Sequence, residues 1–445
     1  MSVDNLSSFT YRAAVVAYAP IRRLIRPALS RRFPLRFCVR ETLCTSWIPT
    51  MRLVAILMTL LAVGFASRAQ ASELTAAFEA ACERTPDIPA LAARRAEIGA
   101  KANAAEALLP GGPWATVLYR DDELTNDRGL REFRAEFDVP VWLRGERGAA
   151  LASALTEGER LEAEITYRRL QVAKRVRDSY WAVEDARARI AVAERRRASA
   201  SRLAQSQKGQ TAAGQTELIE SKLATAEARD ADAELAGLRA ELEEALIAFR
   251  VLTGVEPPRK FRELEAAMPP LHPRIDLRRR ATEKAAADEA LAWTVDRERP
   301  SVGVFSWNVD APGLEPNANT IGVRARIPFA YDGVNQPKRA AAAAEVVAAQ
   351  EELALAEREI AGETAQMRVR LEGARRRLTA LEARRADLAS VVDLTQAAQE
   401  AGQTPLNDLI RARLQLYEAD LARATARVAI ERARSDVNHA LGLEP

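Results

Sequence analysis

The amino-acid sequence predicts a mainly α-helical fold with a small β part, built from two tandem repeats. Ala213-Gly214-Gln215-Thr216 returns as Ala401-Gly402-Gln403-Thr404, 188 positions later. The same offset maps further pairs of residues: Pro140 onto Pro328, Gly145 onto Gly333 and Gly254 onto Gly442. A shared offset indicates a duplication, and a repeat this long is a complete half-domain rather than one unit of a solenoid.

A secretory signal peptide is predicted at residues 51–71. Met51 and Arg52 give a basic start, an apolar run follows, and Ala69-Gln70-Ala71 supplies a small-residue cleavage site. The alternative is a single transmembrane anchor, for which the run is short. Residues 1–50 are interpreted as a doubtful N-terminal extension, repeat 1 as residues 72–256 and repeat 2 as residues 257–445.

Charge and cysteine content weaken the case for two classes of protein. The chain has a net charge of +3, of which residues 1–50 contribute +6 and residues 51–71 contribute +2, leaving about −5 for the mature chain. An acidic mature chain removes the main support for nucleic-acid binding. Only Cys82 lies beyond the leader, so no disulfide framework is expected within one copy.

Repeat 1 predicts the order helix, strand, strand, long helix, helix. Helical spacing runs from Glu73 to Leu109, with a break near Thr85-Pro86. Two short extended segments follow, and the clearer one, residues 130–139, alternates apolar with charged side chains. The stretch after Gly145 has almost no Gly or Pro and predicts a very long helix, which breaks at residues 208–214 and returns as a helix over residues 216–253.

Repeat 2 predicts the same order. A helix is expected over residues 274–297, and two strands follow over residues 300–309 and 321–327, separated by a turn rich in Pro, Gly and Asn. A long helix then runs from Gly333 to about Gln399. The chain breaks at Gly402, and a final helix closes at Gly442.

The strands favour a transmembrane β-barrel. Each has about ten residues with one apolar and one charged face, as expected for a wall between lipid and water; ordinary hairpins on a helical protein are the alternative. Four strands cannot close, and an open edge in lipid leaves backbone groups unpaired. Three copies would supply twelve strands, and alanine-rich helical rods around them would form a hollow periplasmic conduit.

These residues resemble the TolC-like outer-membrane efflux factors over essentially the whole mature chain. The resemblance rests on the duplicated element order and on a few repeated positions: Pro140 and Pro328, Gly145 and Gly333, Gly214 and Gly402, and Gly254 and Gly442. It implies a TolC-like α/β-barrel closed by trimerisation, in the outer membrane with a periplasmic helical extension. It also implies docking of the helix tips onto a periplasmic adaptor (membrane fusion protein) that is served by an inner-membrane pump of the RND type.

Ile327-Pro328-Phe329 and Asp332-Gly333-Val334-Asn335-Gln336 are similar to the heavy-metal CzcC/CusC-like branch of that family. This favours divalent or monovalent metal cations as cargo, and export of drugs or protein remains the alternative. No metal site and no cofactor are expected in the chain itself, because His272, His439 and the few Met and Cys residues form no cluster with metal-ligand spacing.

The resemblance also implies an acidic periplasmic entrance after the second tip. Asp408 matches the first acidic position, whereas Arg411 stands at the second, and Glu220 is the repeat-1 equivalent of Asp408. On three copies Asp408 would form a ring that favours cations. A solvated helix face, with an Asp408–Arg411 surface ion pair, is the other interpretation.

Two further sets of site residues follow. The hairpin tips and adaptor contacts are expected at Gly209, Gly214, Thr216, Gly402 and Thr404, where glycine allows the chain to reverse. Glu132, Arg134, Glu136, Arg324 and Arg326 are expected to line the barrel lumen, since Ile321, Val323 and Ile327 are expected on the opposite face, toward lipid. These arginines either tune anion passage or pair with Glu132, Glu136 or Asp138 and hold the barrel.

Two other classes of protein fit the sequence less well. A periplasmic coiled-coil scaffold without a pore would contain no membrane strand, which the alternation in residues 130–139 opposes. An enzyme would need a catalytic set, and the chain has neither a phosphate-binding Gly-rich motif nor a Ser/His/Asp arrangement. The sequence therefore predicts a passive channel and not an enzyme.

Overall fold

A computed structural model describes residues 73–125, 128–214, 217–259, 261–264, 271–295, 299–311, 318–329 and 332–445. The described residues all belong to one compact unit of the chain, residues 68–445. The predicted N-terminal extension, the signal peptide and Thr216 lie outside the described residues.

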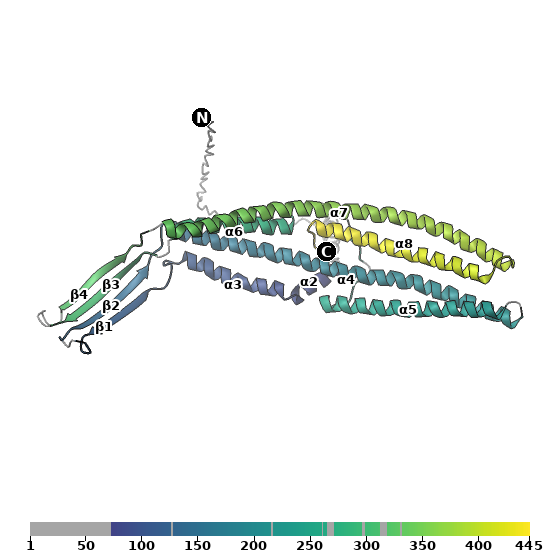
Figure 1. Ribbon diagram of the computed structural model, residues 1–445, viewed down its shortest axis with the longest axis horizontal. Helices are drawn as coiled ribbons and strands as arrows, with labels where there is room; N and C mark the ends of the chain where they lie inside the picture. Colours follow the sequence, from purple (N-terminus) through teal and green to yellow (C-terminus); the bar gives the residue numbers. More distant parts are fainter. Residues whose placement is uncertain are drawn as a thin grey trace, which may run out of the picture. The chain divides into compact units, whose positions relative to one another are not determined.

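Long helices make up most of this unit (Figure 1). Repeat 1 contains α2 (Glu73–Arg84), α3 (Asp87–Glu106), α4 (Glu146–Ala212) and α5 (Leu218–Thr253). Repeat 2 contains α6 (Pro273–Thr294), α7 (Asp332–Glu400) and α8 (Leu406–Ala440). The predicted order of elements is confirmed. The predicted break at residues 208–214 is wrong at its start, because α4 continues to Ala212.

One antiparallel sheet joins the two repeats. Its strands are β1 (Trp114–Asp121), β2 (Arg131–Pro140), β3 (Ser301–Asp310) and β4 (Ala318–Arg326), in the spatial order β1-β2-β3-β4. The central pair, β2 with β3, comes from different repeats. Strands β1 and β4 are the two edges of this sheet.

The long helices form two hairpins that lie against each other. Helix α4 contacts α5, its hairpin partner, and also α3, α6 and α8, while α7 contacts α8 and α6. Within this unit the sheet lies at one end of the helices and the two hairpin turns at the other (Figure 1). The largest buried cluster among the described residues, around Phe78, Tyr180, Trp181 and Phe249, packs α2 against the middle of α4 and the C-terminal end of α5.

The duplication is visible in matched ion pairs of the two hairpins. Arg239 contacts Glu194 at 3.2 Å between α5 and α4, and the positions 188 residues later, Arg427 and Glu382, contact each other at 2.7 Å between α8 and α7. A second pair repeats in the same way, Arg197 with Asp232 and Arg385 with Asp420. The α4–α5 and α7–α8 hairpins therefore share one internal register.

A buried ionic cluster ties the linker between the repeats to the end of the chain. Arg177 of α4 contacts Glu263 at 2.8 Å and donates a hydrogen bond to the Leu443 carbonyl oxygen at 2.8 Å. The Asn438 amide of α8 donates to the other Glu263 oxygen, at 2.8 Å. All three polar side chains, Arg177, Glu263 and Asn438, are buried.

The two histidines lie close to this cluster. Burial lowers the pKa of His439 to about 4, helped by Arg177, Lys174 and His272 and opposed by Asp178. Burial, followed by Arg274, lowers the pKa of His272 to about 4 as well. The His272 Nδ1 accepts a hydrogen bond from the Arg274 backbone N–H at 3.1 Å and so caps α6.

Acid should therefore destabilise the helical part of the protein. A histidine whose folded pKa is depressed contributes stability that is complete above its unfolded pKa of roughly 6.5 and is lost as the pH falls through about 4. We expect the melting temperature to fall between pH 6.5 and 4, and to fall less in His439→Gln. Circular dichroism melts at stepped pH check this, and equal slopes in both proteins would contradict it.

No helix among the described residues has the length and apolar character needed to cross a membrane.

Candidate functional site

The sheet has one apolar and one charged face. Since cross-strand neighbours share a face, the pairing places Phe137, Val304 and Val323 on one side. It places Glu136, Asp138 and Arg324 on the other side. The apolar side chains are the more exposed, with Phe137 at 47% and Val323 at 75%, whereas Asp138 is only 1% exposed. This arrangement is the inverse of a sheet in a water-soluble protein.

Ion pairs cross the charged face between the two repeats. Arg324 of β4 contacts Glu136 of β2 at 2.6 Å and also pairs with Asp138. Arg134 contacts Glu136 at 3.1 Å, and its guanidinium carbon lies 5.8 Å from the ring centre of Phe305 and 5.4 Å from that of Trp307. Arg324 thus has the carboxylate partners that one of the two sequence interpretations foresaw.

The remaining predicted lumen residues lie on this charged face without joining that group. Glu132 approaches Arg120 only at 3.9 Å, and Arg326 is exposed opposite Ser301. The sequence pattern indicates Asp138 only as a possible partner of the strand arginines. It does not predict the stacking of Arg134 on Phe305 and Trp307, although all three residues fall on one face by strand alternation.

Two of the three predicted glycines lie in the hairpin turns. Gly214 and Gly402 both have a φ of +69°, which a side chain would oppose. In the second turn the Gln403 N–H bonds the Ala398 carbonyl at 2.8 Å and the Gly402 N–H bonds that of Gln399 at 3.0 Å, the pattern of a Schellman motif. Gly209 is wrong as a turn residue, because it lies inside α4 with ordinary helical backbone.

The predicted entrance residues lie in the first turns of the returning helices. Glu220 and Asp408 are the acidic residues of the first turns of α5 and α8. Asp408 and Arg411 are both exposed, and the expected ion pair between them is not formed in the described part of the chain. Thr404 is half-buried, and its hydroxyl finds no hydrogen-bond partner among the described residues.

The two hairpins differ in a polar group that the sequence did not reveal. Arg196 of α4 contacts Glu227 of α5 at 2.9 Å, pairs with Glu234, and lies 4.9 Å from the ring centre of Tyr417 on α8. Tyr417 donates a hydrogen bond to Glu234, and burial, followed by this carboxylate, raises the pKa of Tyr417 to about 12. In repeat 2 the matching acids are replaced by Gln415 and Ala422, so this group exists once per chain.

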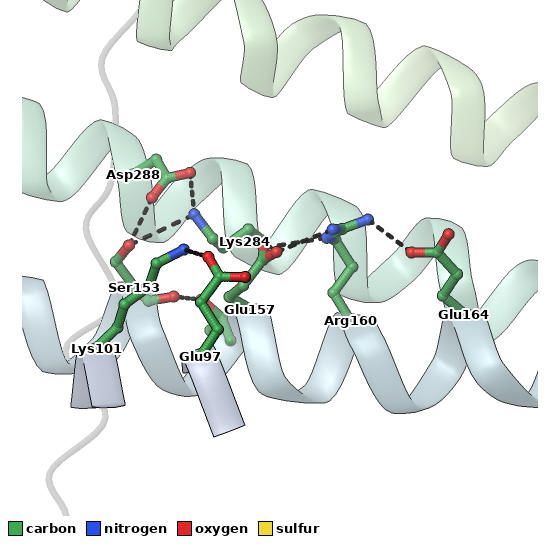
Figure 2. Close-up of polar contacts among 9 residues, drawn as sticks. Glu97, Lys101, Ser153, Glu157, Arg160, Glu164, Lys284 and Asp288 are labelled. Atoms are coloured by element: carbon green, nitrogen blue, oxygen red, sulfur yellow. Dashed lines mark hydrogen bonds and ion pairs between the residues drawn. The ribbon is translucent and has the colours of Figure 1, made fainter. Parts of the chain in front are cut away.

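A hollow of about 680 Å³ lies between α3, α4 and α6. Figure 2 shows polar side chains beside it: Ser153 donates to Asp288 at 2.7 Å, Lys284 pairs with Asp288, and Arg160 contacts Glu157 at 2.9 Å. The hydrogen bond from Arg160 lowers the pKa of the Glu157 carboxyl. Charges of both signs alternate here, and no group of three metal-ligating side chains occurs among the described residues.

The family of this protein follows from a comparison with known sequences. The profile described as outer membrane efflux protein matches residues 77–255 and 273–443, one match for each repeat. The chain belongs to the outer membrane efflux protein family. Membership places the protein in the outer membrane as an efflux component and confirms that it is not an enzyme. No curated protein sequence matches it significantly.

Solved structures share the fold of this outer membrane efflux protein. A membrane protein from Pseudomonas aeruginosa is 18% identical with a TM-score of 0.68, covering 83% of this chain and 94% of its own. VceC of Vibrio cholerae is 17% identical with a TM-score of 0.64, covering 83% and 96%. CusC is 16% identical with a TM-score of 0.66, covering 83% and 92%. The predicted TolC-like fold class is confirmed, and at such low identity the likeness concerns the fold alone.

Proposed function

We propose that this protein is the outer-membrane channel of a tripartite efflux system. It would receive substrate from a periplasmic adaptor and an inner-membrane pump of the RND type and conduct it passively to the outside. The observation that carries the proposal is the inverted sheet, whose apolar side chains are exposed while Glu136, Asp138 and Arg324 on its charged face are buried or half-buried. Such a sheet suits a wall with lipid on one side and water on the other.

Closure of that wall requires further copies. The edges of the sheet, β1 and β4, present unpaired backbone groups, which cost several kcal/mol each in hydrocarbon. Three copies would pair β4 of one with β1 of the next and give a twelve-stranded barrel. Its lumen would then be lined by Glu132, Arg134, Glu136, Arg324 and Arg326.

The hairpin tips are the proposed contact with the adaptor. They lie at the end of the helices away from the sheet, so they would face the periplasm when the sheet is in the outer membrane (Figure 1). Gly214, Gly402, Thr216 and Thr404 would contribute to this contact.

Metal cations are the proposed cargo. Glu220 and Asp408, in the first turns of α5 and α8, would form acidic rings on three copies and favour cations at a narrow entrance. The heavy-metal motif around Pro328 and Gly333 supports the same class of substrate. The chain needs no metal site of its own for passive conduction.

Cell fractionation and resistance assays test this function. We expect heat-labile trimers in the outer membrane, and we expect deletion to sensitise cells to copper or divalent metals more than to dyes and detergents. A soluble periplasmic monomer would overturn the channel. Dye sensitivity with unchanged metal tolerance would be consistent with the channel but would contradict metal cations as its cargo.

Removal of the entrance charge should change ion selectivity. In planar bilayers, Asp408→Ala is expected to raise conductance and to lower the preference for cations, because the substitution removes three carboxylates, one from each copy, from a narrow aperture. Glu418→Ala is the matched control, since Glu418 is also exposed on α8 but lies farther from the tip. Equal selectivity of wild type and Asp408→Ala would assign Asp408 to a solvated helix face.

A further inference from the structure

The contact between the two hairpins of one chain gives a template for the contact between chains. Helix α4 of the first hairpin packs against α8 of the second. At the 188-residue offset α7 is the equivalent of α4, and α5 is the equivalent of α8. If hairpins alternate around a closed ring, the next seam sets α7 of one copy against α5 of the following copy. This reasoning rests on the proposed trimeric channel.

Matched positions at the starts of α8 and α5 differ in how far their side chains are exposed. Leu406, at the start of α8, is 1% exposed because it packs in one cluster with Ala204, Ala224 and Leu203. Its equivalent at the start of α5, Leu218, is 65% exposed. The equivalent of Leu203 is Val391 on α7, which is also exposed. The α4–α8 register would bring Leu218 and Val391 of neighbouring copies together.

Unpaired charges fall at matched positions of the same register. Ser199 of α4 lines a small hollow together with Ile410 and Tyr417 of α8. At the 188-residue offset these positions are Asp387 on α7, and Lys222 and Arg229 on α5. All three are exposed, and none forms an ion pair within the described part of the chain. Asp387 of α7 would thus lie among three bases, Lys222 and Arg229 of α5 and Arg384 of α7, because Arg384 is the equivalent of Arg196, which lies 4.9 Å from the Tyr417 ring.

We propose that copies of this protein join through a seam of α7 against α5 that repeats the α4–α8 register. In this seam Asp387 of one copy pairs with Arg229 and Lys222 of the next, and Leu218 is buried against Val391. The partner of the exposed α5 surface must carry an apolar residue near the tip and an acidic residue at a fixed spacing from it. Helix α7 of a second copy of the same chain has both.

Charge exchange tests the seam. Asp387→Arg and Arg229→Asp, each alone, should lower the temperature at which trimers dissociate by several degrees, since each sets like charges against each other. The double variant should recover most of the loss, because the pair is restored with reversed sign. Both positions are exposed in the single chain, so helix content by circular dichroism should stay unchanged in all three variants.

Disulfide crosslinking gives a second readout. Leu218→Cys with Val391→Cys should yield covalent trimers on non-reducing gels after oxidation with copper phenanthroline. Leu218→Cys with Val347→Cys is the control, because Val347 is also exposed, at 59% against 43% for Val391, but lies toward the start of α7. The one cysteine of the described residues, Cys82, is buried.

The outcomes separate this inference from the proposed function. Trimers that resist both single charge reversals, or double-cysteine trimers that stay uncrosslinked after oxidation, would contradict the seam but not the channel. A wild-type protein that forms no trimer would overturn both.

Discussion

Replacement of Arg177 by alanine is expected to lower the free energy of unfolding by about 3–5 kcal/mol, the usual cost of breaking a buried ion pair from one side. Arg177 and Glu263 are both buried, and Arg177 also holds the Leu443 carbonyl. Without the guanidinium, the Asn438 amide is the one side-chain partner left to the Glu263 carboxylate among the residues that the structure describes. Chemical denaturation followed by circular dichroism measures the loss.

Two controls identify the cause. Arg197 is on the same helix as Arg177, and Arg197→Ala removes its exposed ion pair with Asp232 of α5, which should cost at most about 1 kcal/mol. Arg177→Met combined with Glu263→Gln leaves no buried charge and should recover part of the stability. If Arg177→Ala and Arg197→Ala cost the same, the buried cluster does not stabilise the junction of the repeats.

Gly303→Val is expected to have the second largest effect, through the sheet. A Cβ atom at Gly303 would stand 2.4 Å from the Asp138 Oδ1 and 2.6 Å from the Phe137 backbone oxygen. Relief requires movement of β2 and loss of the Arg324–Asp138 ion pair. Overpacking of this kind costs about 1–3 kcal/mol, repeated in each copy, so far fewer trimers should appear in the outer membrane.

A glycine with free space around it is the control for that substitution. A Cβ atom at Gly148, near the start of α4, would meet no neighbouring atom within 4 Å, and Gly148→Ala should leave trimer yield unchanged. Heated and unheated samples on gels report the yield for both variants. Normal yield for Gly303→Val would mean that β2 and β3 tolerate separation at this pair.

Most of the fold could be predicted from the sequence because the patterns that indicate its helices, strands and turns are local. Alternating side chains defined β2 and β4, and glycines at a shared offset marked both turns, since a positive φ selects glycine wherever the chain reverses. Helix ends were less accurate. The sequence predicts a turn at Gly209, yet α4 runs past it, because a single exposed glycine costs a helix only about 1 kcal/mol.

Sequence pattern could not select partners among many charged residues. The chain has 65 basic and 62 acidic side chains, so each arginine has several plausible carboxylates. An Asp408–Arg411 pair suits helical spacing but is not formed among the described residues, whereas Arg324 and Asp138 pair across 186 positions. Contacts of that kind are set by strand register and not by local spacing.

By itself the sequence determined the duplication, the order of the elements, the two faces of the strands and the family. Each of these depends on the period or the repetition of residue types along one chain. Only the tertiary structure decided that β2 pairs with β3 across the repeats, that Arg177 is buried with Glu263, and that α4 packs on α8. These contacts join residues far apart in the chain, and their free energy depends on burial and geometry that no local pattern encodes.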